Sequence, residues 1–259
     1  MRDYPHRPDE AFLQARLPKL ARRIGISEGA IPEQVAAGNV FIYDAAVDTA
    51  FSVTRVQWAL ERPLDEVTAT LWRTVTWVRD AVANGFEVGP LLIDRWLEIA
   101  IIGGDPGTAA TLVALIDRGA IDLQSRGEAM VAFVGALRAL LQGDRDAAAA
   151  AAGSLGQRLD APDTEPATVQ ALVGLDRMIG ATTAGDQAAF DQAVVMRRQA
   201  RAAAFGGSVQ LRRHPDGLLD AAGASVARLA AVRGRQLPPG DPYLATELLA
   251  AVPWPRTGG

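Results

Sequence analysis

Apolar residues in this chain recur at intervals of three and four, which is the spacing of one face of an α-helix. The stretch 64–83 is the clearest case, with Leu64, Val67, Leu71 and Val75 on one face. The best strand candidate, 40–43, stands alone. The pattern therefore predicts an all-α protein of about 10 to 11 helices, with boundaries uncertain by a few residues. We expect these helices over 9–24, 44–61, 64–83, 90–102, 106–118, 123–142, 145–159, 164–183, 187–204, 216–233 and 242–250.

A Gly-Asp pair recurs three times, each time between two predicted helices. The pairs are Gly104-Asp105, Gly143-Asp144 and Gly185-Asp186, so successive aspartates lie 39 and 42 residues apart. Glycine can end one helix in a left-handed conformation, and aspartate can cap the next. This period is typical of stacked antiparallel helical hairpins, as in tetratricopeptide arrays and other α-solenoids. The alternative is that Gly-Asp simply makes good corners in an ordinary helical bundle.

The length of 259 residues is sufficient for a substantial core. We expect one all-α domain, 1–259, with mobile tails at 1–8 and 252–259. Hydrophobic residues make up 49% of the chain and charged residues 22%, which is ordinary for a globular protein and too polar for a membrane bundle. The N-terminus has no apolar core like that of a signal peptide. These features predict a cytoplasmic protein with no membrane partner.

Residues suited to catalysis or metal binding are sparse. There is no cysteine, which excludes disulfides, thiolate metal sites and cysteine nucleophiles. The two histidines, His6 and His214, are far apart and outside any metal-ligand spacing, and we expect both at the surface. The glycine-rich stretch 103–107 lacks the lysine and the preceding strand of a phosphate-binding loop. The sequence therefore predicts no enzyme, no cofactor and no metal, although scattered carboxylates leave catalysis open.

Residues 20–31 resemble the helix-turn-helix segment of TetR-type repressors, with a turn at Gly25-Ile26-Ser27. Such a motif needs a supporting helix before it. Only the short stretch 8–18 precedes it, and Pro32 follows where the second helix should continue. We therefore favour a helix end followed by a capped turn, and keep a DNA-binding regulator as an alternative. The net charge of −4 also disfavours a nucleic-acid partner.

A basic stretch separates Asp191 from Asp216, with no acidic residue between them. Its arginines are Arg197, Arg198, Arg201, Arg212 and Arg213. The favoured interpretation is a solvated helix face followed by a loop. The alternative is a docking site for an acidic partner or a phosphate backbone, which makes Arg197, Arg198 and Arg201 candidate partner-binding residues.

Trp77 lies opposite the apolar face of the predicted helix 64–83, among polar residues that include Arg73 and Asp80, whereas Trp72 flanks that face. A large aromatic on a polar face is either covered by a neighbouring helix or available to a partner. A stacked array covers many helices on two sides, which favours burial. The alternative makes Trp77, Arg73 and Asp80 partner-binding residues, and predicts that Trp77→Ala weakens binding without unfolding the chain.

The C-terminal part of the sequence contains a predicted small-residue helix, an Arg-Gly turn and a short Tyr-Leu segment. The stretches concerned are PDGLL at 215–219, VARLA at 226–230, Arg233-Gly234, DPYL at 241–244 and ELL at 247–249. Together they resemble the end of the Imm49 family of immunity proteins from bacterial polymorphic toxin systems. The family pattern has a proline where this chain has Ala245.

The resemblance implies a protein that binds a cognate toxin and blocks it by occlusion, without catalysis. Tight inhibitors use a charged, complementary surface around a few buried anchors, so an acidic inhibitor would suit a basic toxin. The main alternative is a helical-repeat scaffold for protein interactions. The sequence specifies neither the toxin nor the oligomeric state.

Overall fold

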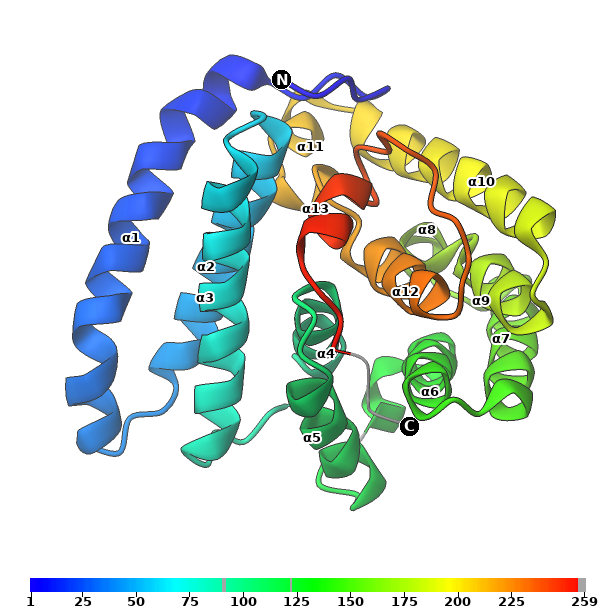
Figure 1. Ribbon diagram of the computed structural model, residues 1–259, viewed down its shortest axis with the longest axis horizontal. Helices are drawn as coiled ribbons and strands as arrows, with labels where there is room; N and C mark the ends of the chain where they lie inside the picture. Colours follow the sequence, from blue (N-terminus) through cyan, green and yellow to red (C-terminus); the bar gives the residue numbers. More distant parts are fainter. Residues whose placement is uncertain (90–91, 122, 256–259) are drawn as a thin grey trace.

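The computed structural model describes residues 1–89, 92–121 and 123–255, and it confirms the all-α class, with no strand in those residues. Figure 1 labels most of the helices. They are α1 (Glu10–Ala36), α2 (Ile42–Ala59), α3 (Leu64–Ala83), α4 (Ile93–Ile102), α5 (Pro106–Asp117), α6 (Glu128–Gln142), α7 (Arg145–Leu159), α8 (Pro166–Leu172), α9 (Leu175–Ala184), α10 (Gln187–Gly206), α11 (Val209–Arg212), α12 (Ala221–Val232) and α13 (Thr246–Ala251). Two short 3₁₀ helices lie at η1 (Leu123–Arg126) and η2 (Pro215–Gly217).

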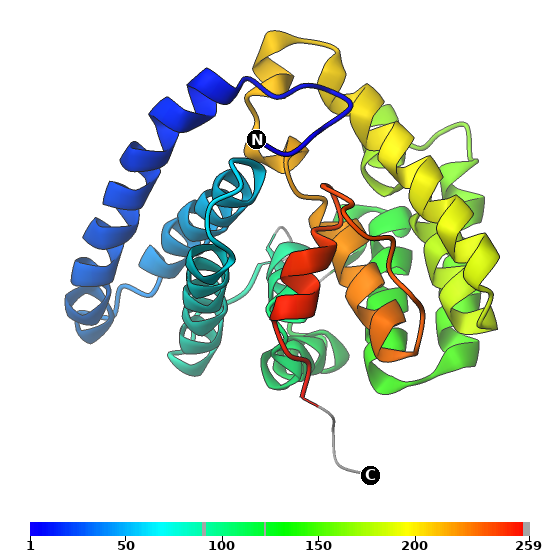
Figure 2. The same ribbon diagram turned by 45° about the horizontal axis from the view of Figure 1, so that its top comes forward.

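Successive helices pair as hairpins, and the resulting array curves around the C-terminal part of the chain. The pairs α1 and α2, α2 and α3, α4 and α5, α6 and α7, and α9 and α10 pack against each other. Figures 1 and 2 show α1 to α3 on one side, α7 to α10 on the other, and α12 and α13 between them. Because α12 packs on both α4 and α9, the chain itself fills the inner side that a solenoid usually offers to a partner.

The three Gly-Asp corners are built as the sequence predicts. Gly104, Gly143 and Gly185 have φ values of +70°, +80° and +77°, so each preceding helix ends in a left-handed residue. The carboxylate that follows each glycine then accepts a hydrogen bond from a backbone N–H of the next helix, at 2.9, 2.9 and 3.0 Å. The same glycine C-cap followed by an aspartate N-cap therefore forms the turns of α4–α5, α6–α7 and α9–α10.

Three arginines of the C-terminal part each reach the end of the first helix of one of these hairpins. Arg228 donates to the Ile102 carbonyl of α4 at 3.0 Å. Arg233 donates to the Leu140 carbonyl in the last turn of α6, and Arg235 to the carbonyl of Gly185, which ends α9. A cation at a helix C-terminus satisfies orphan carbonyls and complements the helix dipole. The C-terminal part therefore connects the three hairpins to one another.

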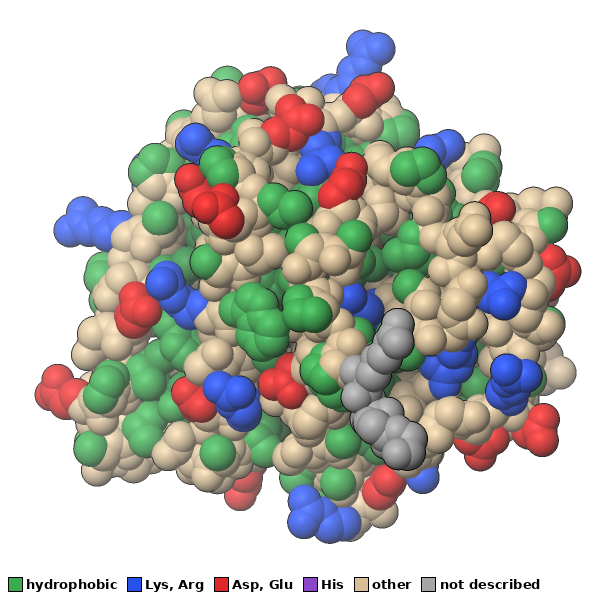
Figure 3. All heavy atoms as spheres, in the orientation of Figure 1, with side chains coloured by type: hydrophobic (Ala, Val, Ile, Leu, Met, Phe, Trp, Pro, Cys, Tyr) green, Lys and Arg blue, Asp and Glu red, His purple; other side chains and the backbone are tan. Residues whose placement is uncertain are grey.

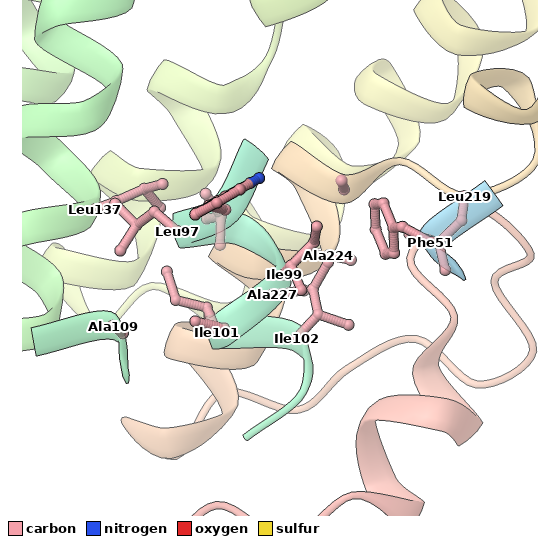
Figure 4. Close-up of a cluster of buried hydrophobic side chains, with 14 of the residues drawn as sticks. Phe51, Leu97, Ile99, Ile101, Ile102, Ala109, Leu137, Leu219, Ala224 and Ala227 are labelled. Carbon is pink, nitrogen blue, oxygen red and sulfur yellow. The ribbon is translucent and has the colours of Figure 1, made fainter. Parts of the chain in front are cut away.

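The core is centred on α4, whose residues from Trp96 to Ile102 are all buried. Figure 4 shows side chains of α4 among those of neighbouring helices, such as Phe51 of α2, Leu137 of α6 and Ala224 of α12. A helix that is mostly apolar and carries only a few charged residues packs inside a protein. Alanines on α12 bring its backbone close to α4, which agrees with the alanine-rich composition.

Several predicted boundaries are wrong. Helix α1 continues to Ala36, with Pro18 and Pro32 inside it, so 20–31 contains no turn and is not a helix-turn-helix. The strand candidate 40–43 instead leads into α2. The predicted helix 164–183 is two helices, because Gly174 has φ +84° and separates α8 from α9.

The N-terminal segment 1–8, expected as a mobile tail, packs against the rest of the protein. The Tyr4 hydroxyl donates to the carbonyls of Leu218 and, at 3.3 Å, Pro242, and both Tyr4 and His6 are buried. His6 Nδ1 lies 2.7 Å from the Tyr243 hydroxyl, which corrects the expected surface position of this histidine. Aromatic rings scattered in a short segment carry no periodic signal, so the sequence pattern did not reveal this packing.

The expected C-terminal tail is also partly packed. Val252 is buried, and its carbonyl accepts a hydrogen bond from Arg228 at 2.8 Å. Residues 256–259 of the predicted tail lie outside the described residues. None of the described helices combines the length and apolar content that crossing a membrane requires.

Candidate partner-binding surface

Trp77 is a core residue, with 7% of its surface exposed, so the partner-binding alternative for this side chain is wrong. Arg73, one turn earlier on the same face of α3, pairs with Glu28 of α1 at 3.3 Å. This ion pair connects α1 to the polar face of α3. Arg73 and Asp80 keep partly exposed side chains. The exposed tryptophan of α3 is Trp72, at 39%, whose position the apolar pattern placed at the edge of the core.

Arg197 is buried, with 1% of its surface exposed, which corrects both the solvated-face interpretation and its assignment to a partner. Its Nε and Nη2 atoms donate to the two carboxylate oxygens of Asp220 at 2.6 and 2.7 Å. A third donor, Nη1, reaches the Val173 carbonyl at 3.0 Å. Burial raises the pKa of Asp220, but the guanidinium groups of Arg197 and Arg201 outweigh this and bring it to about 2. The pair joins α10 to the start of α12.

Arg201 is structural as well. It is buried, its guanidinium lies 4.5 Å from the centre of the Phe205 ring, and it donates to the Asp216 carbonyl. Arg198 is exposed and stays a candidate contact. The basic stretch therefore contains two buried arginines, which hold α10 to the C-terminal part. Of the other three, Arg198 is exposed, whereas Arg212 and Arg213 are partly buried and Arg213 pairs with Asp9 at 2.8 Å.

A second group of buried charges lies between α2, α4 and η2. Arg55 of α2 pairs with Asp216 of η2. Glu98 of α4 is buried beside this pair, and burial together with the charges of Asp94 and Asp220 raises its pKa to about 8. Within the described residues no three histidine or carboxylate side chains are placed to hold a metal ion. We therefore assign this group to the interior of the fold.

The C-terminal part borders two surface grooves. The first, which we name the α12–α13 groove, has a volume of about 690 Å³. Helices α12 and α13 and the segment 235–240 enclose it, with Leu237 and Leu249 among its apolar side chains. The second, the α5–α6 groove, has a volume of about 660 Å³ and lies between α5, the end of α6 and α12. Val232, which is 47% exposed, and the partly buried Trp254 line both grooves.

Four arginines line these grooves without a carboxylate partner among the described residues. Arg228 and Arg235 belong to the α12–α13 groove, and Arg145 and Arg233 to the α5–α6 groove. Burial alone lowers the pKa of Arg228 to about 10, so this side chain stays charged at neutral pH. The space-filling view in Figure 3 shows charges of both signs across the face that carries α3 and α13, with apolar side chains between them.

The two acidic residues that line the grooves already have partners. Asp117 of the α5–α6 groove pairs with Arg138 at 3.0 Å, and Glu247 of the α12–α13 groove lies 3.5 Å from Arg2. Sequence reasoning missed both grooves, because tertiary packing forms them. The α5–α6 groove lies where α12 and Trp254 meet α5 and the end of α6, more than 80 residues earlier. The residues that line the α12–α13 groove all lie between 228 and 254. The sequence feature that could have indicated the grooves was Val232, an apolar residue between Arg228 and Arg233 near the end of a helix.

Comparison with family models, with curated proteins and with solved structures finds no match to this chain.

Proposed function

We propose that this protein is an immunity protein, which binds a cognate bacterial toxin in the cytoplasm and blocks it by occlusion. The observation that carries the proposal is the position of the segment that resembles the Imm49 family. Helices α12 and α13 form much of the wall of the α12–α13 groove, and Arg233, in the turn after α12, lines the α5–α6 groove. Part of the segment that supports the resemblance therefore lies at this surface. Arg228, Glu247 and Leu249 line the α12–α13 groove, and Leu229 and Arg233 line the α5–α6 groove.

The construction of this surface suits an inhibitor that works by steric occlusion. Its arginines are held against helix ends, so little side-chain freedom is lost when a partner binds. Trp254 and Val232 supply apolar anchors at the centre, and aromatic anchors surrounded by polar groups carry most of the energy of tight interfaces. Occlusion needs such a rigid surface and no reacting group.

One departure from the family pattern has a structural reason. Ala245 replaces the expected proline and has φ +53°, and the proline ring fixes φ near −65°. This backbone conformation excludes proline at 245. The start of α13 therefore differs here from what the resemblance implies.

The alternatives are weaker. A helical-repeat scaffold usually binds along its inner surface, and α12 occupies that surface here. A DNA-binding regulator through 20–31 would need a turn within α1, and α1 is one continuous helix. Both observations favour a partner that binds at the outer grooves.

The test is co-expression with the product of a toxin-like gene immediately upstream. We expect the wild-type chain to protect cells and to co-purify with that product. Val232→Glu places a charge at the centre of the surface and should abolish both protection and co-purification. Arg62→Glu, at an exposed position between α2 and α3, should leave protection and co-purification unchanged. Growth arrest despite ample wild-type protein would refute the proposal.

A further inference from the structure

We infer that the α5–α6 groove and the α12–α13 groove together bind an acidic, apolar segment of the partner protein. This inference rests on the proposed function for its view that the ligand is a protein. It adds the chemistry of the bound segment. It also reverses the expectation from the net charge of −4, which pointed to a basic partner.

The first argument is the local charge. Four arginines line the two grooves, and no carboxylate of the described residues pairs with any of them. The two acids present, Asp117 and Glu247, are close to other arginines outside the grooves. A basic segment would therefore meet unpaired positive charge, and like charges facing each other at an interface cost several kcal/mol.

The second argument is the arrangement of Arg233 and Arg145. Arg233 and Arg145 both line the α5–α6 groove, and burial together with the Arg145 charge lowers the pKa of Arg233. Arg233 is held at this position by the Leu140 carbonyl and, at 3.4 Å, the Leu229 carbonyl. Arg145 is exposed at the first position of α7. A carboxylate between the two guanidinium groups would relieve their repulsion and accept charge-assisted hydrogen bonds.

The third argument is the apolar surface between the charges. Val232 and Trp254 border both grooves, and Val113, Leu229 and Leu249 extend the apolar walls on either side. Volumes of about 690 and 660 Å³ are in the range that accepts several side chains. A free inorganic anion would leave these walls uncovered. A segment with acidic and apolar side chains matches both features.

The test uses the purified chain and three blocked synthetic peptides. One contains glutamate, leucine and tryptophan, the second replaces each glutamate by lysine, and the third contains glutamate and glycine alone. We expect the first peptide to bind, with an affinity that falls as salt is raised, and the other two to bind at least about tenfold more weakly. Equal or tighter binding of the lysine peptide would overturn the charge argument. Equal binding of the glycine peptide would overturn the apolar one.

Variants locate the site. Arg145→Glu should weaken binding of the first peptide about fivefold or more, and it should leave the fold intact because a glutamate suits the first turn of α7. Arg62→Glu has the same charge change away from both grooves and should bind as the wild type does. If the two variants weaken binding equally, the grooves are not the site. Thermal unfolding of each variant separates loss of binding from loss of fold.

The outcome is separable from that of the proposed function. Protection from a toxin without binding of the acidic peptide would leave the immunity function standing and refute the acidic segment. Binding of the peptide at the grooves, combined with failure to protect against the neighbouring gene product, would refute the immunity function and leave the acidic segment standing.

Discussion

Glu98 offers the sharpest test of how charges are arranged in this interior. Its carboxyl group is buried in α4, with Asp94 one turn before it on the same helix and Asp220 at the start of α12. Arg55 of α2 and Arg95 of α4 oppose these acids, but burial dominates and raises the pKa of Glu98 to about 8. The side chain therefore keeps its proton at neutral pH in the folded protein.

The sign of the pH dependence follows directly. In the unfolded chain Glu98 ionises near its ordinary pKa of 4.5, whereas the folded chain holds the proton up to about pH 8. The unfolded state thus binds fewer protons across this interval, and the stability falls as the pH rises. At pH 7 the penalty is about 3 kcal/mol, since each unit of pKa difference is worth about 1.4 kcal/mol. Replacing Glu98 by glutamine, which resembles the protonated acid, removes this penalty.

We therefore expect Glu98→Gln to raise the free energy of unfolding by up to about 3 kcal/mol at pH 7, and to leave it nearly unchanged below pH 4.5. Urea unfolding of both proteins from pH 4 to pH 8 measures the difference. Glu87→Gln, at an exposed position, is the matched control and should show no such dependence. A difference that stays constant with pH, or a variant that loses stability toward pH 8, would refute the reasoning.

Three further predictions concern buried side chains. Trp77→Ala should lower the free energy of unfolding by about 3 to 5 kcal/mol, and Trp72→Ala by less than about 1 kcal/mol; equal losses in urea unfolding would contradict the assigned burial. Asp220→Asn leaves the guanidinium of Arg197 buried without its counter-charge and should cost about 3 to 5 kcal/mol, and a near-neutral effect would show that the pair is dispensable. Burial lowers the pKa of His6 to about 4 from its ordinary 6.5, so the stability of the protein should fall as the pH drops from about 6.5 to 4. The His6→Phe variant should lack this pH dependence when it and the wild type are compared by thermal unfolding.

The features that the sequence predicts well are local ones. Helix α3 begins and ends at the predicted residues, and the corners at Asp105, Asp144 and Asp186 form as expected. A cap and a left-handed glycine are decided by neighbours a few residues away, so their signals survive in the sequence.

The candidate site was harder to predict, because distant packing decides it. Helical periodicity placed Trp77 among polar residues, but it could not show that this side chain is buried. Arg197 appeared solvated because its counter-charge, Asp220, belongs to another helix. The grooves beside Trp254 require α12 to lie inside the array, and no local pattern encodes that position.

The hydrogen bonds from the C-terminal part to the three Gly-Asp hairpins also determine when the protein can finish folding during synthesis. The hairpins leave the ribosome first, with short-range contacts that form quickly, while the surface destined for α12 is still open to water. Arg228, Arg233 and Arg235 arrive late, and Tyr4 must wait for Pro242, the partner of a hydrogen bond that spans almost the whole chain. A nascent chain is therefore a substrate for proteases and chaperones until α12 and α13 have emerged. The grooves proposed to bind a toxin need residues as far as Trp254, so partner binding can begin only after this segment has been made.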